Sequence, residues 1–419
     1  MRQWLRRSCC VLTLMIGIVG ALSAQRPIEW SRRPVLLMTM GQGDEVFEKF
    51  GHNAIIVWDD EAGMPLVYNW GLFDFRQPNF MGRFLSGDTK YWMAPATWDQ
   101  ALNQYQRLNR TVTVQELQLT PSQKAHLVAM LRQNAREENK YYRYDYYRDN
   151  CSTRARDAID AVTNGALKRA MQSQPGEGSY RWHTRRLLAY SDPLYIGAEL
   201  VLGVDSDPTL SQWEEAFLPQ SLSESLMRIR LPAAEGMPER ALVTPIDTVF
   251  RAEREAEPRD VSLKVSLSLV VGLVLAALIV LIARTGRIGA GIAIGAWSLK
   301  SALLGCVLLY MWLATKHVFM AKNPSVALLN PLWLIGVVAA VMAARGGVSW
   351  MVQRAMWVLP VIGVIVTGAA IRLGHAGSAL EIAALVLPGH AAVVWAVNRY
   401  ARVTIKGTEL LIGSRALSP

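Results

Sequence analysis

The alternation of polar and apolar positions divides the 419-residue chain into three regions. The first 24 residues combine a basic start, a short apolar run and small residues at 21–24, which is the pattern of a cleaved export signal. An uncleaved membrane anchor is the alternative for this region, although its apolar run is short for a span. Residues 25–257 alternate short apolar runs with polar segments, as a folded domain does, and residues 258–419 hold long apolar runs.

The third region predicts an α-helical membrane domain of about five spans. The apolar runs cover residues 262–283, 295–315, 325–344, 355–371 and 379–398. Most of these runs are long enough to cross about 30 Å of hydrocarbon as a helix. Lys300 and His390 fall near the middle of spans two and five, where ionisable groups are candidates for function. For Lys300 we favour a plainer interpretation, in which span two begins later and the ammonium group reaches the cytoplasmic interface.

Basic residues in the connections predict the orientation of these spans. One set of connections and the C-terminal tail hold Arg284, Arg287, Arg345, Arg354, Arg399, Arg402, Lys406 and Arg415. The other set holds only Lys316, Lys322 and Arg372. Because basic residues accumulate on the cytoplasmic side, the first set and the C-terminus belong in the cytoplasm. Five spans then place residues 25–257 in the periplasm, which predicts a multi-pass protein of the inner (cytoplasmic) membrane.

The same topology accounts for the net charge of +10. Residues 25–257 carry 27 Lys+Arg against 31 Asp+Glu, whereas residues 258–419 carry 14 against 3. The excess of basic residues therefore lies in the predicted membrane region, where it reflects the orientation of the spans. It does not form the basic surface of a nucleic-acid-binding protein. We expect no nucleic acid among the partners.

Within residues 25–257 the periodicity predicts an α+β domain. Residues 34–41, 52–60 and 64–71 have the short apolar, β-branched runs of strands, and a further strand lies within 106–119. Two helices follow. The first begins with a Thr-Pro pair at 120–121 and continues through 139. The second begins near Cys151, with Asn150 or Ser152 as its N-cap and apolar residues at helical spacing.

Cysteine usage singles out one thiol in the predicted periplasmic domain. The four cysteines are Cys9 and Cys10 in the export signal, Cys151, and Cys306 within span two. Of the two that remain after cleavage, Cys151 belongs to the periplasmic domain and Cys306 to the bilayer, so they predict neither a disulfide framework nor a zinc cluster. We expect no cofactor. At the first turn of a helix, the amide dipoles favour a thiolate and lower its pKa. Because its neighbours are polar, we interpret Cys151 as a nucleophile; a buried structural cysteine is the alternative.

A thiol nucleophile needs a base, and residues 25–257 offer three histidines. His126 sits among ordinary surface residues of a predicted helix, and His183 has a polar setting that suits a structural role equally well. His52 opens a strand directly after Gly51, whose missing side chain leaves room near the imidazole. A strand-start histidine facing a helix-start cysteine is the arrangement of papain-like thiol enzymes. Here the histidine comes first, an order that suits a circularly permuted version of that fold.

Two further features complete the predicted site. Asn69, on the strand after His52, is the candidate for orienting the imidazole through its far nitrogen, with an ordinary strand-end asparagine as the equal alternative. The backbone amides of Cys151 and Ser152 are candidates for stabilising an oxyanion, and Asn150 supports the turn that carries them.

With these residues in view, the chain resembles the family named for the Lnb N-terminal periplasmic domain. The similar segments are "FGHNAIIVWD", "VYNWGLFDF", "YYRDNCSTRARDAID", "SYRW" and "GVDSDPTLSQWEEAFLPQSLSESL", which together span about residues 34–230. The "FGH" and "NCST" blocks are the specific ones, and "NCST" departs from the common "NCTT" only by a hydroxyl-preserving exchange.

The resemblance implies a circularly permuted papain-like fold of the NlpC/P60 type, with Cys151 and His52 as the catalytic pair and, less firmly, Asn69. For the Lnb branch it implies acyl transfer on bacterial lipoproteins. The sn-2 acyl chain of the diacylglyceryl group moves through a thioester to the α-amine of the lipidated N-terminal cysteine, which leaves a lyso-lipoprotein. The implied partners are bacterial lipoproteins and membrane lipids.

Two other functions fit the same residues. Many NlpC/P60 relatives are peptidoglycan peptidases or amidases, but these are usually soluble or carry wall-binding modules, whereas five spans favour a lipid substrate. A membrane scaffold with a structural Cys151 is the non-enzymatic alternative. A scaffold thiol is expected to react slowly with an electrophile, and an activated thiol quickly and at mildly acidic pH.

Overall fold

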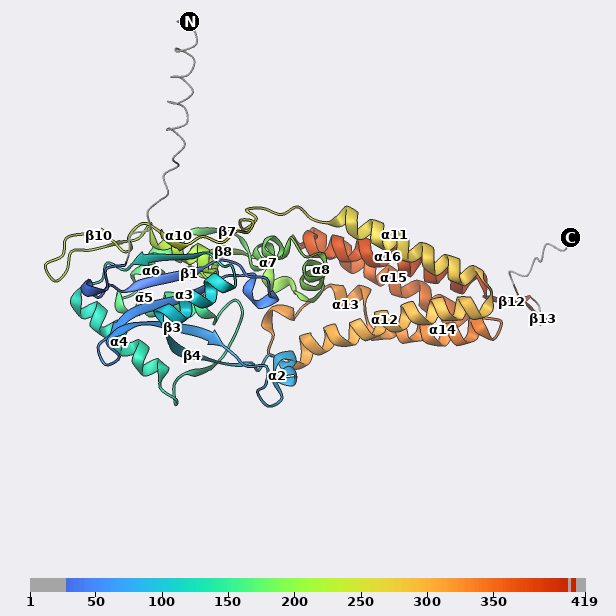
Figure 1. Cartoon of the computed structure of the whole chain (residues 1–419). Helices are drawn as coiled ribbons and strands as arrows, with labels where there is room; N and C mark the ends of the chain where they lie inside the picture. Colours follow the sequence, from blue (N-terminus) through green and yellow to red (C-terminus); the bar gives the residue numbers. More distant parts are fainter. Residues whose placement is uncertain (1–27, 406–407, 412–419) are drawn as a thin grey trace, which may run out of the picture.

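The computed structural model describes residues 28–405 and 408–411, which form two parts joined side by side (Figure 1). We call residues 28–257 the sheet domain and residues 258–411 the helical domain. The predicted export signal lies outside the described residues. The mixed α and β character predicted for the first part and the helical character predicted for the second are both confirmed.

A seven-stranded antiparallel sheet forms the centre of the sheet domain, in the order β11-β5-β1-β2-β3-β4-β6. Its strands are β1 (Leu36–Met40), β2 (His52–Asp59), β3 (Met64–Leu72), β4 (Lys90–Thr97), β5 (Val112–Glu116), β6 (Tyr141–Arg143) and β11 (Asp247–Phe250). The four strands that the sequence predicts are β1, β2, β3 and β5. The periodicity did not predict β4, β6 or β11.

Helices cover both faces of this sheet. They are α2 (Phe80–Ser86), α3 (Trp98–Arg107), α4 (Pro121–Ala135), α5 (Cys151–Val162), α6 (Ala166–Met171), α7 (Tyr180–Leu188), α8 (Asp192–Val201), α9 (Gln212–Glu215) and α10 (Pro219–Leu226). Short 3-10 turns and two-stranded pairs complete the domain: η2 (Trp30–Arg32), η3 (Val46–Glu48), η4 (Val204–Ser206), β7 (Pro175–Ser179) with β8 (Thr209–Ser211), and β9 (Arg230–Leu231) with β10 (Arg240–Ala241). Both predicted helices are present as α4 and α5.

The two faces of the central strands carry separate cores. Because successive side chains of a strand point to opposite faces, β1 and β2 bury apolar residues on both sides. Leu37, Ile55 and Val57 pack with residues of α4 and α5 in one core, whereas Met38 and Ile56 pack with α3 in another. The fold therefore places α5 against one face of β2 and α3 against the other.

The helical domain contains five helices long and apolar enough to cross a membrane, within the part of the chain that is described. Its elements are α11 (Val265–Arg284), α12 (Arg287–Ala314), η5 (Val318–Met320), α13 (Ser325–Leu328), η6 (Pro331–Trp333), α14 (Leu334–Ala344), α15 (Trp350–Arg372), α16 (Ala376–Arg399) and the hairpin of β12 (Arg402–Ile405) and β13 (Thr408–Leu411). The α11–α12 and α14–α15 turns lie at the end far from the sheet domain (Figure 1). The more basic set of connections is therefore at that end, as the charge count predicts.

The structure resolves the setting of the two ionisable residues in the spans. α12 runs from Arg287 to Ala314, so Lys300 lies near the middle of this helix; that the span begins later than the helix and lets the ammonium group reach the cytoplasmic interface stays a prediction. Its side chain is exposed at the middle of α12, with Nζ 3.4 Å from the centre of the Trp297 ring. His390 is fully buried and accepts a hydrogen bond from Trp297 Nε1 at 2.9 Å, while its Nε2 donates to the carbonyl of Leu328 at 3.0 Å. Because both nitrogens of this histidine have partners, it joins helices structurally.

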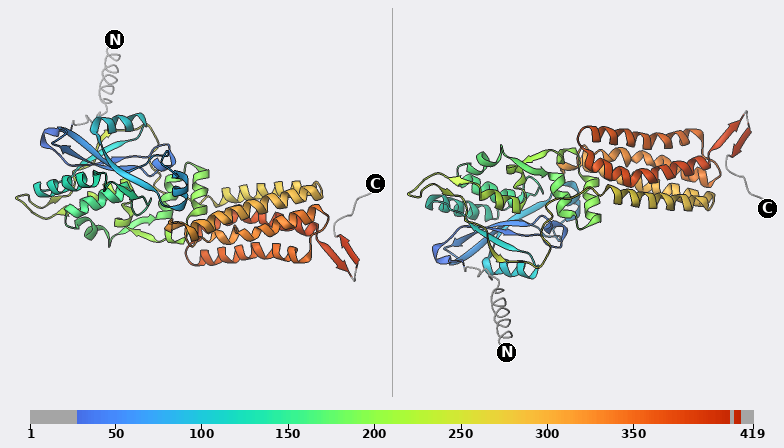
Figure 2. Two further views of the ribbon diagram at one scale, coloured as in Figure 1. Left: turned by 90° about the horizontal axis from the view of Figure 1, so that it is seen from below. Right: turned by 90° about the horizontal axis from the view of Figure 1, so that it is seen from above.

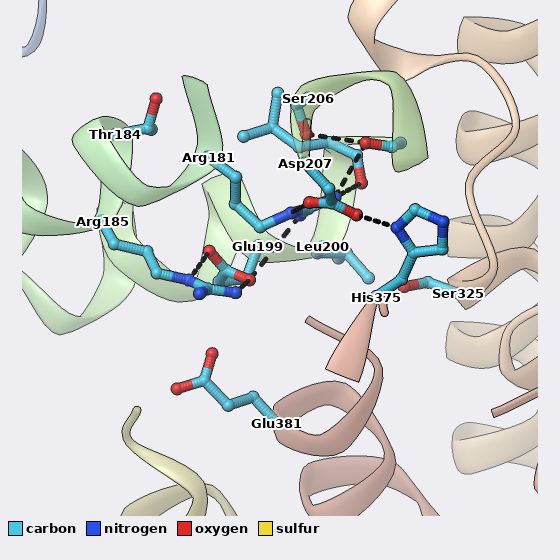
Figure 3. A network of polar contacts seen from close by, with 12 residues as sticks. Arg181, Thr184, Arg185, Glu199, Leu200, Ser206, Asp207, Ser325, His375 and Glu381 are labelled. Carbon is cyan, nitrogen blue, oxygen red and sulfur yellow. Dashed lines mark hydrogen bonds and ion pairs between the residues drawn. The ribbon is translucent and has the colours of Figure 1, made fainter. Parts of the chain in front are cut away.

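Polar contacts dock the sheet domain onto one end of the helical domain (Figures 2 and 3). Asp207, which is paired with Arg181, accepts a hydrogen bond from His375 Nδ1 at 2.6 Å. On α8, the Tyr195 hydroxyl donates to Glu381 at the start of α16, 2.8 Å away. Because several such contacts join the two parts, the sheet domain is held close to the ends of the apolar helices.

Candidate functional site

Cys151 is the first residue of α5, where its position follows from a strong N-cap. The side chain of Asn150 accepts hydrogen bonds from the N–H groups of Ser152 and Thr153, both at 2.9 Å. Its own amide donates to the carbonyls of Tyr146 and Phe217. An N-cap of this kind contributes about 1 kcal/mol to helix stability. Asn150, and not Ser152, is therefore the cap that fixes the helix start.

The hydroxyl of Ser152 links the cysteine turn to the neighbouring strand. Ser152 is fully buried, and its Oγ donates to the carbonyl of Ala216 and lies 2.8 Å from Asn53 Oδ1. Toward the start of β2, the ladder between β2 and β3 ends at the Ala54–Asn69 pair, and Asn53 is the residue directly before Ala54. Beyond that pair, the N–H of Asn53 approaches the Cys151 thiol closely enough to favour a thiolate.

His52 starts β2 and is held by two neighbours. Its Nε2 lies 3.3 Å from Asn69 Oδ1, and its ring stacks on Tyr105 with 6.4 Å between the ring centres. Asn69 Nδ2 donates to the carbonyl of Val67, which directs the amide oxygen toward the histidine. An oxygen acceptor requires the proton on Nε2, so Nδ1 is left as the basic nitrogen. The contact predicted between Asn69 and the far nitrogen of His52 is thus present; its catalytic role remains a prediction.

The thiol and the imidazole both lie around the start of β2, and no hydrogen bond between them is present among the described residues. Asn53, the residue after His52, contacts the start of α5 through Ser152. Catalytic hydrogen bonds are often long in unliganded enzymes and shorten when substrate binds. The arrangement is therefore compatible with a Cys–His pair but does not show one formed.

The glycine before His52 has a role in the turn that leads into β2. Gly51 has φ +76, and a Cβ there would lie 2.8 Å from the carbonyl oxygen of Met40 and 3.6 Å from Pro219. The missing side chain therefore allows the chain to turn into β2 beside β1 and α10. That the missing side chain also leaves room near the imidazole stays a prediction.

The other two histidines have separate surroundings. His126 is exposed on α4. His183 is fully buried on α7, where Nε2 lies 2.6 Å from Glu215 Oε1 and Nδ1 accepts a hydrogen bond from Arg186 at 3.2 Å. Both ring nitrogens of His183 are occupied, so its contacts are those of a structural residue.

The pKa of the Cys151 thiol contradicts the expectation from its helix position. Burial raises this pKa above the ordinary value, while the backbone N–H groups of Asn53 and Ser152 and the charge of Arg110 act in the opposite direction. The thiol is only 7% exposed, and desolvation of a thiolate outweighs the amide dipoles. The expectation of a lowered pKa is therefore wrong, because it counted the helix dipole and left out burial.

The pKa of His52 is shifted in the direction that keeps the ring neutral. Burial and, after it, the nearby charge of Arg110 lower the pKa of His52 to about 4, whereas the hydrogen bond with Asn69 acts the other way. The resting site at neutral pH is thus a neutral thiol beside a neutral imidazole. Such a site ionises the thiol by transferring its proton to the histidine during the reaction, and it does not store a thiolate beforehand.

Two residues of this site were missed by sequence reasoning. Arg110 is 4% exposed, and it pairs with Glu48 at 3.2 Å and donates to the carbonyl of Gly41 at 2.9 Å. Tyr142, on β6, has a buried hydroxyl without a hydrogen-bond partner among the described residues. A Cβ on Gly71 would lie 3.9 Å from this hydroxyl and 3.8 Å from the Cβ of Cys151. The Tyr142 hydroxyl is therefore a donor available beside the nucleophile.

The raised thiol pKa predicts how Cys151 reacts with an uncharged alkylating reagent. Because less thiolate is present at a given pH, the rate with iodoacetamide should be slow at pH 6 and should still be rising at pH 9. Peptide mass spectrometry separates the Cys151 adduct from that of Cys306, the exposed thiol on α12. A rate that levels off below pH 7 would show a stored thiolate and contradict this description. Because a buried nucleophile and a scaffold thiol are both expected to react slowly here, alkylation alone does not separate these two functions.

A polar cavity of about 900 Å³ lies elsewhere in the sheet domain, and neither Cys151 nor His52 lines it. Two arginines on its wall form ion pairs, Arg186 with Glu257 and Arg254 with Asp44. The chemistry of the Cys151 region therefore does not depend on this cavity.

Comparison with known proteins shows a similarity between the sheet domain and one protein family. Residues 28–190, which include Cys151, His52 and Asn69, match the family described as Lnb N-terminal periplasmic domain. The match ends before the "FLP" segment at 217–219, which the sequence resemblance included. No curated protein and no solved structure matches the chain significantly. A periplasmic domain of this family beside five apolar helices fits an Lnb-like multi-pass membrane protein, and the family suggests an enzyme of the lipoprotein-modifying kind. Residues 28–190 of the chain are therefore similar to the Lnb N-terminal periplasmic domain family.

Proposed function

We propose that the protein is a membrane-bound thiol acyltransferase of the inner membrane. It moves the sn-2 acyl chain of a diacylglyceryl lipoprotein to the α-amine of the lipidated N-terminal cysteine, through a thioester on Cys151. The observation that carries this proposal is the position of Cys151 at the capped start of α5, beside the N–H of Asn53 and near a histidine oriented by Asn69. The helical domain, docked against the same sheet domain, supports a substrate that resides in the bilayer.

We also propose that the sheet domain is a circularly permuted papain-like fold. The base and its orienting residue lie on adjacent antiparallel strands, β2 and β3, and the nucleophile starts the helix that packs on β2. Papain-like enzymes use the same three parts, with the cysteine first along the chain. In this chain the order is His52, Asn69, Cys151, which is the order that a permutation produces.

In the first half of the proposed reaction, His52 Nδ1 takes the thiol proton as Cys151 Sγ attacks the carbonyl of the sn-2 ester. The N–H groups of Cys151 and Asn53 stabilise the oxyanion, with the Tyr142 hydroxyl as a further donor. Asn53 takes the place predicted for Ser152, because the Ser152 N–H donates to Asn150 Oδ1. The ester C–O bond then breaks. The departing glycerol oxygen takes the proton from His52, which leaves a thioester on Cys151 and a free hydroxyl on the glycerol.

In the second half, the α-amine of the lipidated cysteine attacks the thioester carbonyl. His52 removes a proton from the amine and returns it to the departing Cys151 sulfur, so the enzyme is regenerated. The amide that forms is more stable than the thioester, and this step requires mainly that the amine be held near the carbonyl. The net result is transfer of one acyl group from oxygen to nitrogen within the same lipoprotein.

The test is mass spectrometry of a model diacylated lipoprotein incubated with the intact protein in lipid vesicles. Intramolecular transfer leaves the mass of the N-terminal lipopeptide unchanged but moves one acyl group to an amide, which fragmentation and selective ester hydrolysis reveal. Loss of one acyl group with a free amine would instead indicate hydrolysis. Cleavage of soluble muropeptides, with no change in the lipopeptide, would replace the proposal by the peptidase alternative.

A further inference from the structure

The sheet domain exposes a group of large apolar side chains around α2 and η3. We call Val46, Phe47, Phe75, Met81, Phe84 and Leu85 the aromatic patch. Each of these residues is between 46% and 64% exposed. Soluble proteins rarely expose a contiguous apolar surface unless it meets a partner or a membrane. The patch therefore indicates an interaction surface.

Half-buried phenylalanines make the patch continuous. The Phe73 ring lies 5.2 Å from Phe47, 5.0 Å from Phe75 and 6.0 Å from Phe80, measured between ring centres. Phe80 in turn stacks on Phe84 at 6.2 Å. These separations are those of packed aromatic pairs, so η3, the loop after β3, and α2 form one surface.

The patch is attached to the end of a membrane helix. The loop that follows α12 binds α2 directly, because the N–H of Lys316 donates to the carbonyl of Ser86 at 2.8 Å and His317 Nε2 donates to the carbonyl of Phe84 at 2.9 Å. Lys316 Nζ also pairs with Asp88 at 2.6 Å. Figure 1 shows α2 beside the sheet-domain end of α12. If α12 spans the bilayer, the patch lies at the level where lipid head groups meet acyl chains.

A row of rings leads from the patch to the nucleophile. Phe73 lies 5.0 Å from Tyr91, and Tyr91 stacks on Tyr144 at 4.4 Å. A Cβ on Gly71 would lie 3.4 Å from the Tyr144 ring and 3.8 Å from the Cβ of Cys151. Gly71 and Phe75 are four residues apart, so their backbones are separated by at most about 14 Å.

We infer that the aromatic patch inserts among the acyl chains of the outer leaflet and guides the acyl chain of the substrate toward Cys151. The occupant is lipid hydrocarbon, because the patch is uncharged, exposed and fixed at the end of α12. A side chain at position 71 would contact both the Tyr144 ring and the Cβ of Cys151, so the glycine keeps the end of the row of rings free of a side chain next to the thiol. Insertion of the patch concerns only the bilayer; guidance of the acyl chain rests on the proposed acyltransferase function.

The test uses the intact protein in phospholipid vesicles that contain a phospholipid with a photoreactive group at the end of one acyl chain. After illumination, peptide mass spectrometry should find lipid adducts on the peptides that carry residues 46–47 and 73–85, in addition to those from the spans. Adducts confined to the spans would overturn the insertion of the patch. This result is independent of any enzymatic activity.

A variant separates the two parts of the inference. Phe75→Ser combined with Phe84→Ser should reduce the adducts and raise the KM for a vesicle-bound diacylated lipoprotein about tenfold or more, because the apolar surface that captures lipid is lost. Met64→Ser, at the tip of the β2–β3 hairpin, is the matched control, since Met64 is also an exposed apolar residue at 42%. Circular dichroism melting and the alkylation rate of Cys151 check that the variants fold.

The possible outcomes are distinct. An unchanged KM in the double variant, with adducts reduced, would show a membrane contact without acyl-chain guidance. An equal effect of Met64→Ser would show that the change is unspecific and would overturn the inference. If the wild-type protein turns over no lipoprotein while the patch still forms adducts, the proposed function fails and the membrane contact stands.

Discussion

Cys151→Ala is expected to reduce the rate of acyl transfer by about 10⁴-fold or more, because no other group in the site can form the acyl intermediate. The substitution removes one sulfur from a nearly buried position and leaves the Asn150 cap and the Ser152 bonds in place. The domain should therefore remain folded. The rate is measured on a diacylated lipoprotein in vesicles, with the melting temperature recorded in parallel.

Cys306→Ala is the matched control, because Cys306 is an exposed thiol on α12 away from the sheet domain. It should retain the wild-type rate. Near-normal turnover by a folded Cys151→Ala protein would show that the thiol is structural. Both the proposed reaction and the papain-like interpretation would then be wrong.

His52→Ala is expected to slow the reaction by about 10²- to 10⁴-fold, the usual contribution of a general acid–base group. Because the pKa of His52 is lowered to about 4, the neutral ring persists as the pH falls and is lost only near that value. The acid limb of the kcat/KM profile of the wild-type enzyme should therefore lie near pH 4, well below the ordinary histidine pKa of about 6.5. An acid limb near pH 6.5 would contradict the role or the environment assigned to His52.

Comparison variants separate catalysis from stability. Asn69→Ala should cause a smaller loss of rate than His52→Ala, because Asn69 orients the ring without taking part in proton transfer. His183→Ala leaves the carboxylate of Glu215 without its partner and should lower the free energy of unfolding by about 3 kcal/mol. His126→Ala, on the exposed side of α4, should change neither quantity. A folded His183→Ala protein that loses more activity than His52→Ala would transfer the role of base to His183.

Local patterns were sufficient to predict the elements on which the candidate site is built. The apolar runs that became β2 and β3, and the polar cap before Cys151, each depend on neighbours within a few residues. Strands that owe their existence to distant partners were not predictable in this way. β11 pairs with β5 across more than a hundred residues, and β6 is only three residues long.

The electrostatics of the site depend on the tertiary fold, and this is where sequence reasoning failed. The sequence shows a thiol at a helix start, but it does not show that Cys151 is 7% exposed, so the direction of its pKa shift was predicted wrongly. Nothing in the predicted strand segment 106–119 marks Arg110 as buried, yet in the fold it is 4% exposed, pairs with Glu48 and acts on the pKa of His52. The Asn53 amide and the Tyr142 hydroxyl become visible as donors only when the sheet and α5 are in place.

The most direct test of the central claim is to trap the acyl group on residue 151. Wild-type protein is incubated with a diacylated lipoprotein whose sn-2 chain is isotopically labelled, and the peptide that contains residue 151 is analysed by mass spectrometry during turnover. The label should be on Cys151 and be released by hydroxylamine, and Cys151→Ala protein should carry none. We predict the labelled thioester on wild-type Cys151 during turnover. Turnover of the lipoprotein by wild-type protein with no label ever found on Cys151 would contradict the account.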